Sequence, residues 1–240
     1  MALVHTNVLL QALSSFTGVA VKAYNDLEKP NQELTGFLLQ ASTLDSLNTG
    51  SCKGLFVNME KFFDSKFDYD CTNVKDDTTF RRGNEPYMRP FGWKRIALNV
   101  LDKYPDGNAW LGTDGWRSHS VAGEWPVSYH GTSMFKAKSI IKSNYEAGPR
   151  QRYGGGIYST CDINEAANRY SKIFTCKETG KRYQVLLQNR INPKMRKVCD
   201  REDYWLIEVP DGTSREEEKA IVENSIRPYG LLLREVKEEY

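Results

Sequence analysis

Residues 129–132, Tyr-His-Gly-Thr, and residues 153–159, Tyr-Gly-Gly-Gly-Ile-Tyr-Ser, form the two halves of one expected ligand site. The first segment places an imidazole, a glycine backbone and a hydroxyl next to one another. The consecutive glycines of the second segment let the backbone approach a ligand or another strand, because no Cβ intervenes. A lone Tyr-His-Gly-Thr is typical of a structural turn, and it is the presence of both segments that favours a ligand site.

The residues around these two segments predict a sheet with few helices. Alternating and apolar runs indicate strands at 124–129, 157–159, 183–191, 204–209 and 229–236. Helical spacing indicates helices at 135–143, 162–174 and 214–224, and Asp162 is the expected N-cap of the second of these. Late strands with few intervening helices favour a mixed α+β sheet over a parallel βαβ repeat.

The first 85 residues predict a helical and loop-rich region that precedes a larger domain over residues 86–240. Apolar residues recur at helical spacing over 8–27, a second helix is expected at 32–41, and turn formers indicate a loop at 44–53. The stretch 76–93 is dense in turn formers, arginines and aromatics. It predicts an irregular packed loop, with a partner or substrate surface as the alternative. Trp110, Trp116 and Trp125 are expected packing anchors.

The composition is that of a soluble globular protein. Hydrophobic residues make up 40% of the 240 residues and charged residues 27%, and the formal net charge of +2 lacks the basic footprint of a duplex-binding protein. Five cysteines without CxxC spacing predict neither a zinc site nor a disulfide framework, so no metal is expected. Neither a signal peptide nor a run of transmembrane length is present, which predicts a cytoplasmic or nuclear protein without a membrane partner.

Several short motifs occur in the order found in a known family. His130-Gly131-Thr132 is followed by Gly156-Ile157-Tyr158, by residues 166–170 and by the strand 185–187, and then by residues 204–207 and 228–232. This ordered set resembles the ADP-ribosyltransferases of the poly(ADP-ribose) polymerase or diphtheria-toxin-like branch, whose site is described as H-Y-E. The resemblance covers roughly the C-terminal half. It implies an α+β fold with a split mixed or antiparallel sheet and flanking helices over residues 86–240.

The resemblance implies that NAD is the co-substrate. Such enzymes break the nicotinamide glycosidic bond through an oxocarbenium-like transition state and pass ADP-ribose to a macromolecular acceptor. For this chain a protein acceptor is preferred over a nucleic acid, and the acceptor stays open. His130 would bond the adenosine ribose, while Tyr158 and Tyr170 would sandwich the nicotinamide ring. The implied NAD-binding residues are His130, Gly131, Thr132, Gly156, Tyr158 and Tyr170.

The third catalytic residue of the family is a glutamate that immediately precedes the aromatic residue of its strand. The residue before Tyr204 is Asp203, Glu202 lies one place earlier, and Glu223 is a third candidate if the late strands are assigned differently. The implied catalytic set is therefore His130 and Tyr158 with one of these three acids.

Because aspartate is one methylene shorter than glutamate, the expected activity is mono-ADP-ribosyl transfer. The alternatives are an inactive binding module and an NAD glycohydrolase. A phosphate transfer of the tRNA phosphotransferase kind would need a basic cluster, and the sequence shows only scattered arginines.

Overall fold

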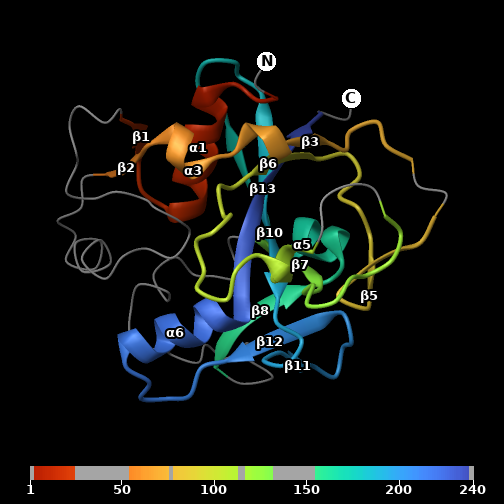
Figure 1. Cartoon of the computed structure of the whole chain (residues 1–240). Helices are drawn as coiled ribbons and strands as arrows, with labels where there is room; N and C mark the ends of the chain where they lie inside the picture. The colour runs from red at the N-terminus through yellow and green to blue at the C-terminus, as the bar shows by residue number, and fades with distance from the viewer. Residues whose placement is uncertain (1–2, 25–53, 76–77, 113–116, 132–154, 238–240) are drawn as a thin grey trace.

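A large antiparallel sheet organises the computed structural model, which describes residues 3–24, 54–75, 78–112, 117–131 and 155–237 (Figure 1). The sheet has the strand order β11-β12-β8-β7-β10-β13-β6-β3, and β9 pairs with β10 beside this path. Its strands are β3 (Tyr69–Asp70), β6 (Lys94–Ala97), β7 (Val127–Gly131), β8 (Gly156–Thr160), β9 (Lys172–Thr175), β10 (Arg182–Ile191), β11 (Lys197–Val198), β12 (Tyr204–Glu208) and β13 (Ile226–Val236). With few helices around it, this sheet confirms the expected α+β class.

Two smaller sheets and short helices surround the large one. β1 (Val21–Ala23) pairs in parallel with β2 (Leu55–Val57), and β4 (Phe80–Arg82) pairs antiparallel with β5 (Glu85–Tyr87). The helices are α1 (Thr6–Thr17), α3 (Met59–Phe62), α5 (Ile163–Tyr170) and α6 (Arg215–Ser225), and the 3-10 turns are η1 (Ser65–Phe67) and η2 (Ala109–Leu111).

Helices cover both faces of the large sheet (Figure 1). Because side chains alternate along a strand, Leu187 and Leu231 point to the face covered by α1, whereas Leu186 and Leu232 point to the face covered by α5. Helix α6 closes a third cluster with β8 and β12. Since α1 packs on this sheet and β3 belongs to it, the described parts of residues 1–85 and 86–240 share one core.

Several predicted elements are confirmed where local chemistry is strong. Asp162 caps α5 by accepting hydrogen bonds from the backbone N–H of Asn164 at 2.8 Å and of Glu165 at 3.4 Å. Ser214 and Glu217 form a capping box at the start of α6. The strands predicted at 157–159, 183–191 and 204–209 correspond to β8, β10 and β12.

Three predicted boundaries are wrong for identifiable reasons. The helix predicted over 8–27 ends at Thr17, because Gly18 adopts φ 76° and its N–H bonds the Ser14 carbonyl, after which β1 begins. The helix predicted over 162–174 ends at Tyr170, because Ser171 is extended and leads into β9. The strand predicted over 229–236 begins earlier, at Ile226, and contains a bulge opposite Gln188 and Asn189.

The stretch 76–93 is partly regular. The loop prediction is wrong for residues 80–87, where β4 and β5 form a hairpin. Gly83 and Asn84 join the strands with φ values of 58° and 66°, the combination that a two-residue type I′ hairpin turn requires. The predicted helices at 32–41 and 135–143, the loop at 44–53 and Trp116 lie outside the described residues.

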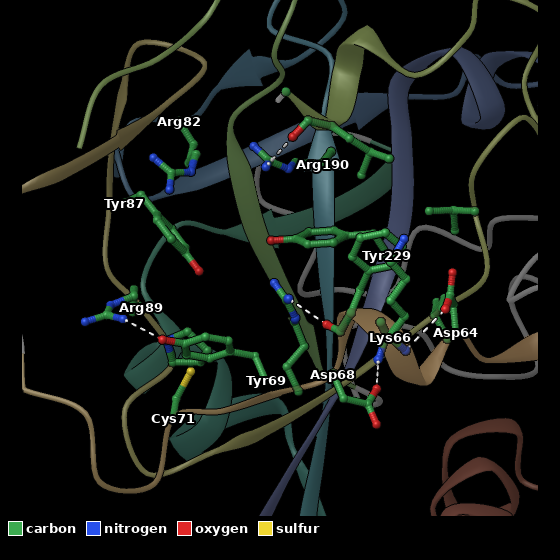
Figure 2. Close-up of a pocket in the computed structure, with 18 of the residues that line it drawn as sticks. Asp64, Lys66, Asp68, Tyr69, Cys71, Arg82, Tyr87, Arg89, Arg190 and Tyr229 are labelled. Atoms are coloured by element: carbon green, nitrogen blue, oxygen red, sulfur yellow. Dashed lines mark hydrogen bonds between the residues drawn. The ribbon is translucent and has the colours of Figure 1, made fainter. Parts of the chain in front are cut away.

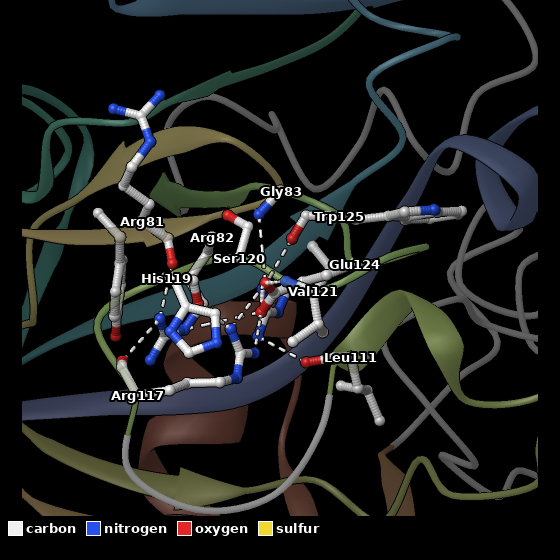
Figure 3. A network of polar contacts seen from close by, with 12 residues as sticks. Arg81, Arg82, Gly83, Leu111, Arg117, His119, Ser120, Val121, Glu124 and Trp125 are labelled. Atoms are coloured by element: carbon white, nitrogen blue, oxygen red, sulfur yellow. Dashed lines mark hydrogen bonds and ion pairs between the residues drawn. The ribbon is translucent and has the colours of Figure 1, made fainter.

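A buried ion cluster fixes the hairpin and the entry to β7 (Figure 3). The Glu124 carboxylate receives a bidentate interaction from Arg117, a 3.0 Å bond from Arg190 Nη1 and a 3.6 Å ion pair from Arg82 Nε. These arginines come from β4, from the loop before β7 and from the end of β10. One buried carboxylate therefore ties together three distant parts of the chain.

Gly156 is the glycine that the strand pairing requires. It adopts φ 151°, and a Cβ added there would overlap the Ile207 carbonyl oxygen of β12. Gly156→Ala is therefore expected to lower the free energy of unfolding by about 2 kcal/mol, measured by urea denaturation. Gly155→Ala is the matched control, because its nearest contact is an ordinary 3.6 Å from Val209 O, and we expect a change of about 0.5 kcal/mol or less. Equal losses in both variants would contradict this explanation.

Candidate functional site

The strands that carry the three parts of the motif are consecutive neighbours in the sheet. β7 contains His130, β8 contains Tyr158, and β12 follows directly on Glu202 and Asp203. β8 and β12 pair along five residues, whereas β7 and β8 pair at one position, Tyr129 with Thr160. β7 and β8 therefore diverge beyond this pair, and His130 and Tyr158 lie where they diverge.

His130 is fully buried at this point of divergence. Its Nδ1 lies 2.6 Å from the Tyr158 carbonyl oxygen. Because a carbonyl can only accept, Nδ1 carries the hydrogen, and Nε2 of the neutral ring has acceptor character. Burial lowers the pKa of His130 to about 3, and the bond to Tyr158 opposes this only in part. At neutral pH the ring is uncharged and suited to accept a hydrogen bond from a hydroxyl group.

The motif glycines permit close backbone approaches. A Cβ on Gly131 would overlap the Tyr170 carbonyl at the end of α5, just as one on Gly156 would overlap β12. For Gly156, the chain that approaches is thus another strand, which was one of the two alternatives for the glycine run. Thr132 lies outside the described residues.

Tyr158 and Tyr170 pack against one apolar cluster with Tyr204. The Tyr170 and Tyr204 rings meet edge to face with centroids 6.1 Å apart, and their hydroxyl oxygens are 2.8 Å apart. Tyr204 donates to Glu165 Oε1 at 2.6 Å, so Tyr170 donates to Tyr204. Burial and the bond to Glu165 raise the pKa of Tyr204 well above its ordinary value. This series of hydrogen bonds from Tyr170 through Tyr204 to Glu165 fixes the position of the Tyr170 ring.

Sequence reasoning did not find Glu165 and Tyr204 as site residues. Helix α5 and strand β12 bring them together, and no local spacing rule relates residues so far apart in the chain. The aromatic-rich start of the predicted strand at 204–209 was the available signal, and it pointed to the acids before it instead.

The structure places two of the three candidate acids beside this cluster. Asp203 is paired with Arg201 through Nη2 at 2.8 Å and Nε at 3.2 Å, and Arg201 also bonds Glu165 at 3.2 Å. Glu202 is exposed, and its backbone carbonyl accepts a bond from Trp205 Nε1. Both acids therefore lie in the turn that leads into β12.

The third candidate acid, Glu223, lies elsewhere. Helix α6 packs with Val222 in the cluster that contains Ile157 of β8. Because neighbouring residues of a strand point to opposite faces, Tyr158 points away from α6. Glu223 is paired with Lys219 at 3.7 Å. The structure thus does not bring Glu223 to Tyr158.

Within the described ranges, no group of three or more His, Cys, Asp and Glu side chains is arranged to hold a metal ion. None of the helices in the described part of the chain has the length and apolar character to cross a membrane. No known protein-family model matches this chain, and no curated protein matches it.

Proposed function

We propose that this protein is an NAD-dependent mono-ADP-ribosyltransferase, which transfers ADP-ribose to a macromolecular acceptor, preferably a protein, and releases nicotinamide. One observation carries the proposal. His130 and Tyr158 lie on neighbouring strands and are joined by a 2.6 Å contact, and the next strand in the sheet begins at the acids Glu202 and Asp203. The motif order of the sequence thus corresponds to adjacency in the sheet.

The chemistry of these side chains fits NAD. The neutral imidazole of His130 offers an acceptor to a ribose hydroxyl, and the rings of Tyr158 and Tyr170 offer faces to the cationic nicotinamide. Tyr170 is held in place by Tyr204 and Glu165, so its orientation is fixed before a ligand binds. In this proposal Tyr158 and Tyr170 bind and orient the nicotinamide ring, whereas His130 binds the adenosine ribose.

The acid supplies the remaining interaction. Cleavage of the glycosidic bond places positive charge on the ribose, and a carboxylate near that ribose stabilises the charge. Glu202 and Asp203 both belong to the turn that enters β12. Asp203 is held by Arg201, whereas Glu202 is exposed. The two carboxylates therefore differ in charge compensation, and their single substitutions are expected to differ in effect.

The test is to incubate the protein with NAD and measure released nicotinamide by chromatography and NAD binding by calorimetry. Tyr158→Ala is expected to weaken NAD binding, whereas Tyr158→Phe keeps the ring and is expected to retain it. Of Glu202→Gln and Asp203→Asn, one is expected to lower turnover about a hundredfold with little change in affinity.

Glu223→Gln is the control for the acids, because α6 packs on the other face of β8, and wild-type turnover is expected. Neither nicotinamide release nor NAD binding in the wild type would contradict the proposal. Equal turnover in Glu202→Gln and Asp203→Asn would contradict the assignment of the acid. Release of nicotinamide without labelling of any acceptor would indicate a glycohydrolase.

The ion pair between Asp203 and Arg201 favours a second candidate, a catalytically inactive NAD or ADP-ribose binding module. A carboxylate whose charge is neutralised by a guanidinium contributes less to stabilising a developing positive charge. Saturable NAD binding without nicotinamide release would identify this function. Arg201→Gln would then be expected to give measurable release, because it frees the Asp203 carboxylate.

A further inference from the structure

A cavity of about 490 Å³ opens among the β4–β5 hairpin, β6 and the start of β13 (Figure 2). Its size is within the usual range for small-molecule sites. Arg190, which lines it, pairs with Val127 at the start of β7, whereas His130 lies three residues further along that strand. At 3.3 Å per residue this is about 10 Å, so the cavity is separate from the proposed NAD site.

Cationic side chains dominate the lining of this cavity. Among the described residues that line it, two are carboxylates, Asp64 and Asp68. The cationic residues that line it are Lys66, Arg82, Arg89, Arg95, Arg117 and Arg190. The arginines that the sequence shows as scattered are therefore assembled by the fold into one basic cluster.

This positive charge is incompletely compensated. Arg82, Arg117 and Arg190 share the single carboxylate of Glu124, and all of these side chains are largely buried. Burial lowers the pKa of Arg82, and the neighbouring charge of Arg117 lowers it further, as expected where like charges are crowded. Three guanidinium groups on one carboxylate leave excess positive charge beside the cavity.

Unused hydrogen-bond donors accompany the charge. The Nε atoms of Arg95, Arg117 and Arg190 are buried, and none has a hydrogen-bond partner within the described parts of the chain. Buried donors without a partner are costly, so the three guanidinium groups, whose residues line the cavity, are incompletely stabilised by the protein. An anionic ligand in the cavity would compensate the charge of these guanidinium groups.

Aromatic rings alternate with these arginines. The Arg190 and Arg95 guanidinium groups lie 5.2 Å and 5.7 Å from the Tyr229 ring centroid, and the Arg82 group lies 5.4 Å from that of Tyr87. Figure 2 shows the hydroxyl groups of Tyr87 and Tyr229 pointing toward one another. Leucine and valine side chains, including those of residues 98, 100 and 101, form another part of the wall. The cavity thus combines a basic side with an aromatic and apolar side.

We propose that this cavity binds a phosphate ester with a flat apolar body, the chemical class of a nucleotide. Guanidinium groups are the preferred partners of phosphate oxygens, and the aromatic and apolar wall is suited to a planar ring. The ligand would bind here independently of the NAD site.

The probe is AMP, titrated calorimetrically into the wild-type protein at low salt, with inorganic phosphate and adenosine as separate arms. Saturable one-to-one binding of AMP is expected, with weaker binding of phosphate and weakest binding of adenosine. Arg95→Gln is expected to weaken AMP binding roughly tenfold or more, the loss of one charge-assisted hydrogen bond. Arg182→Gln, which removes an exposed arginine of β10 outside the cavity, is the matched control and is expected to bind like the wild type.

A substitution that removes a negative charge from the cavity lining, instead of a positive one, provides a second measurement. Asp68→Asn removes a carboxylate from the lining but keeps an oxygen to accept the Ala97 N–H, which is now bonded at 2.8 Å. It is expected to tighten AMP binding roughly threefold. Circular dichroism shows whether Arg95→Gln is folded. If it is not, the AMP affinity of Asp68→Asn still tests the proposal.

Several results would overturn the proposal. They are no AMP binding by the wild type, equal affinity for adenosine and AMP, phosphate binding as tight as AMP binding, and affinities that do not change in Arg95→Gln or Asp68→Asn. His130→Ala, which disables the proposed NAD site, is expected to retain AMP binding. Loss of AMP binding in His130→Ala alone would assign the nucleotide to the NAD site instead.

Discussion

Glutamine in place of Glu124 is expected to lower the free energy of unfolding by about 3–5 kcal/mol, the usual cost of removing one partner from a buried ion pair. The Glu124 carboxylate is buried and contacts Arg82, Arg117 and Arg190. Without its charge, three buried guanidinium groups repel one another with no compensation. The fixed geometry of the β4–β5 hairpin and of the entry to β7 depends on the same carboxylate.

Guanidinium chloride unfolding of Glu124→Gln against the wild type measures this cost. Glu208→Gln is the matched control, because Glu208 pairs with Lys197 at 2.7 Å on the exposed surface, and we expect a loss below about 1 kcal/mol. Similar losses in the two variants would contradict the central role of Glu124.

The stabilisation that the Glu124 cluster provides is also expected to depend on pH. Burial by itself would raise the pKa of Glu124, but the Arg117 hydrogen bond and the charges of Arg190 and Arg117 outweigh it, so the pKa lies below its ordinary value. The stabilisation is therefore present above the unfolded-state pKa and is lost as the pH falls through the folded-state pKa. Glu124→Gln is expected to lack this acid-sensitive contribution.

Local chemistry explains which parts of the fold could be predicted from the sequence. Asp162 is predicted correctly as a helix cap, and the helix predicted from residue 214 begins one residue later, at Arg215 after the Ser214 cap, because a cap depends on the three or four residues that follow it. β10 is predicted correctly because strand-forming residues recur over residues 183–191 and the turn formers Asn192 and Pro193 follow. The end of α1 was missed because the apolar spacing continues past Gly18, whereas the left-handed conformation of that glycine ends the helix.

The site could be predicted only in the part that lies within short motifs. His130 and Tyr158 are recognisable as members of ordered motifs, and the structure brings them into contact. The support of Tyr170 by Glu165 and Tyr204 depends on the packing of α5 against β12, which no local pattern encodes. The basic cavity was missed for the same reason, because its arginines come from separate strands and loops that only the complete sheet brings together.

The second large expected effect is a loss of stability at low pH that the titration of His130 causes. Burial lowers its folded-state pKa to about 3, whereas the unfolded chain has the ordinary value of 6.5. Below pH 6.5 the His130 ring therefore binds a proton in the unfolded state but not in the folded state. The free energy of unfolding consequently falls as the pH falls, until the folded-state pKa is reached. The slope is about 1.4 kcal/mol per pH unit, so His130 alone is expected to remove about 3 kcal/mol between pH 7 and pH 4.

His130→Gln tests this expectation, because the glutamine amide can still donate to the Tyr158 carbonyl but cannot take up a proton. Urea denaturation measures the free energy of unfolding of both proteins at several pH values from 7 to 4. The amount by which the wild type exceeds the variant is expected to fall by about 3 kcal/mol over this range, because the carboxylates titrate in both proteins and their contributions cancel. His119→Gln, which removes an exposed imidazole, is the control and is expected to follow the wild-type profile. Parallel profiles for wild type and His130→Gln would mean that the pKa of His130 is the same in the folded and unfolded states, which would contradict a ring kept neutral by burial. A ring that takes up a proton near pH 6.5 in the folded state has no acceptor nitrogen below that pH, so binding of the NAD ribose to His130 would then be expected to weaken as the pH falls below 6.5.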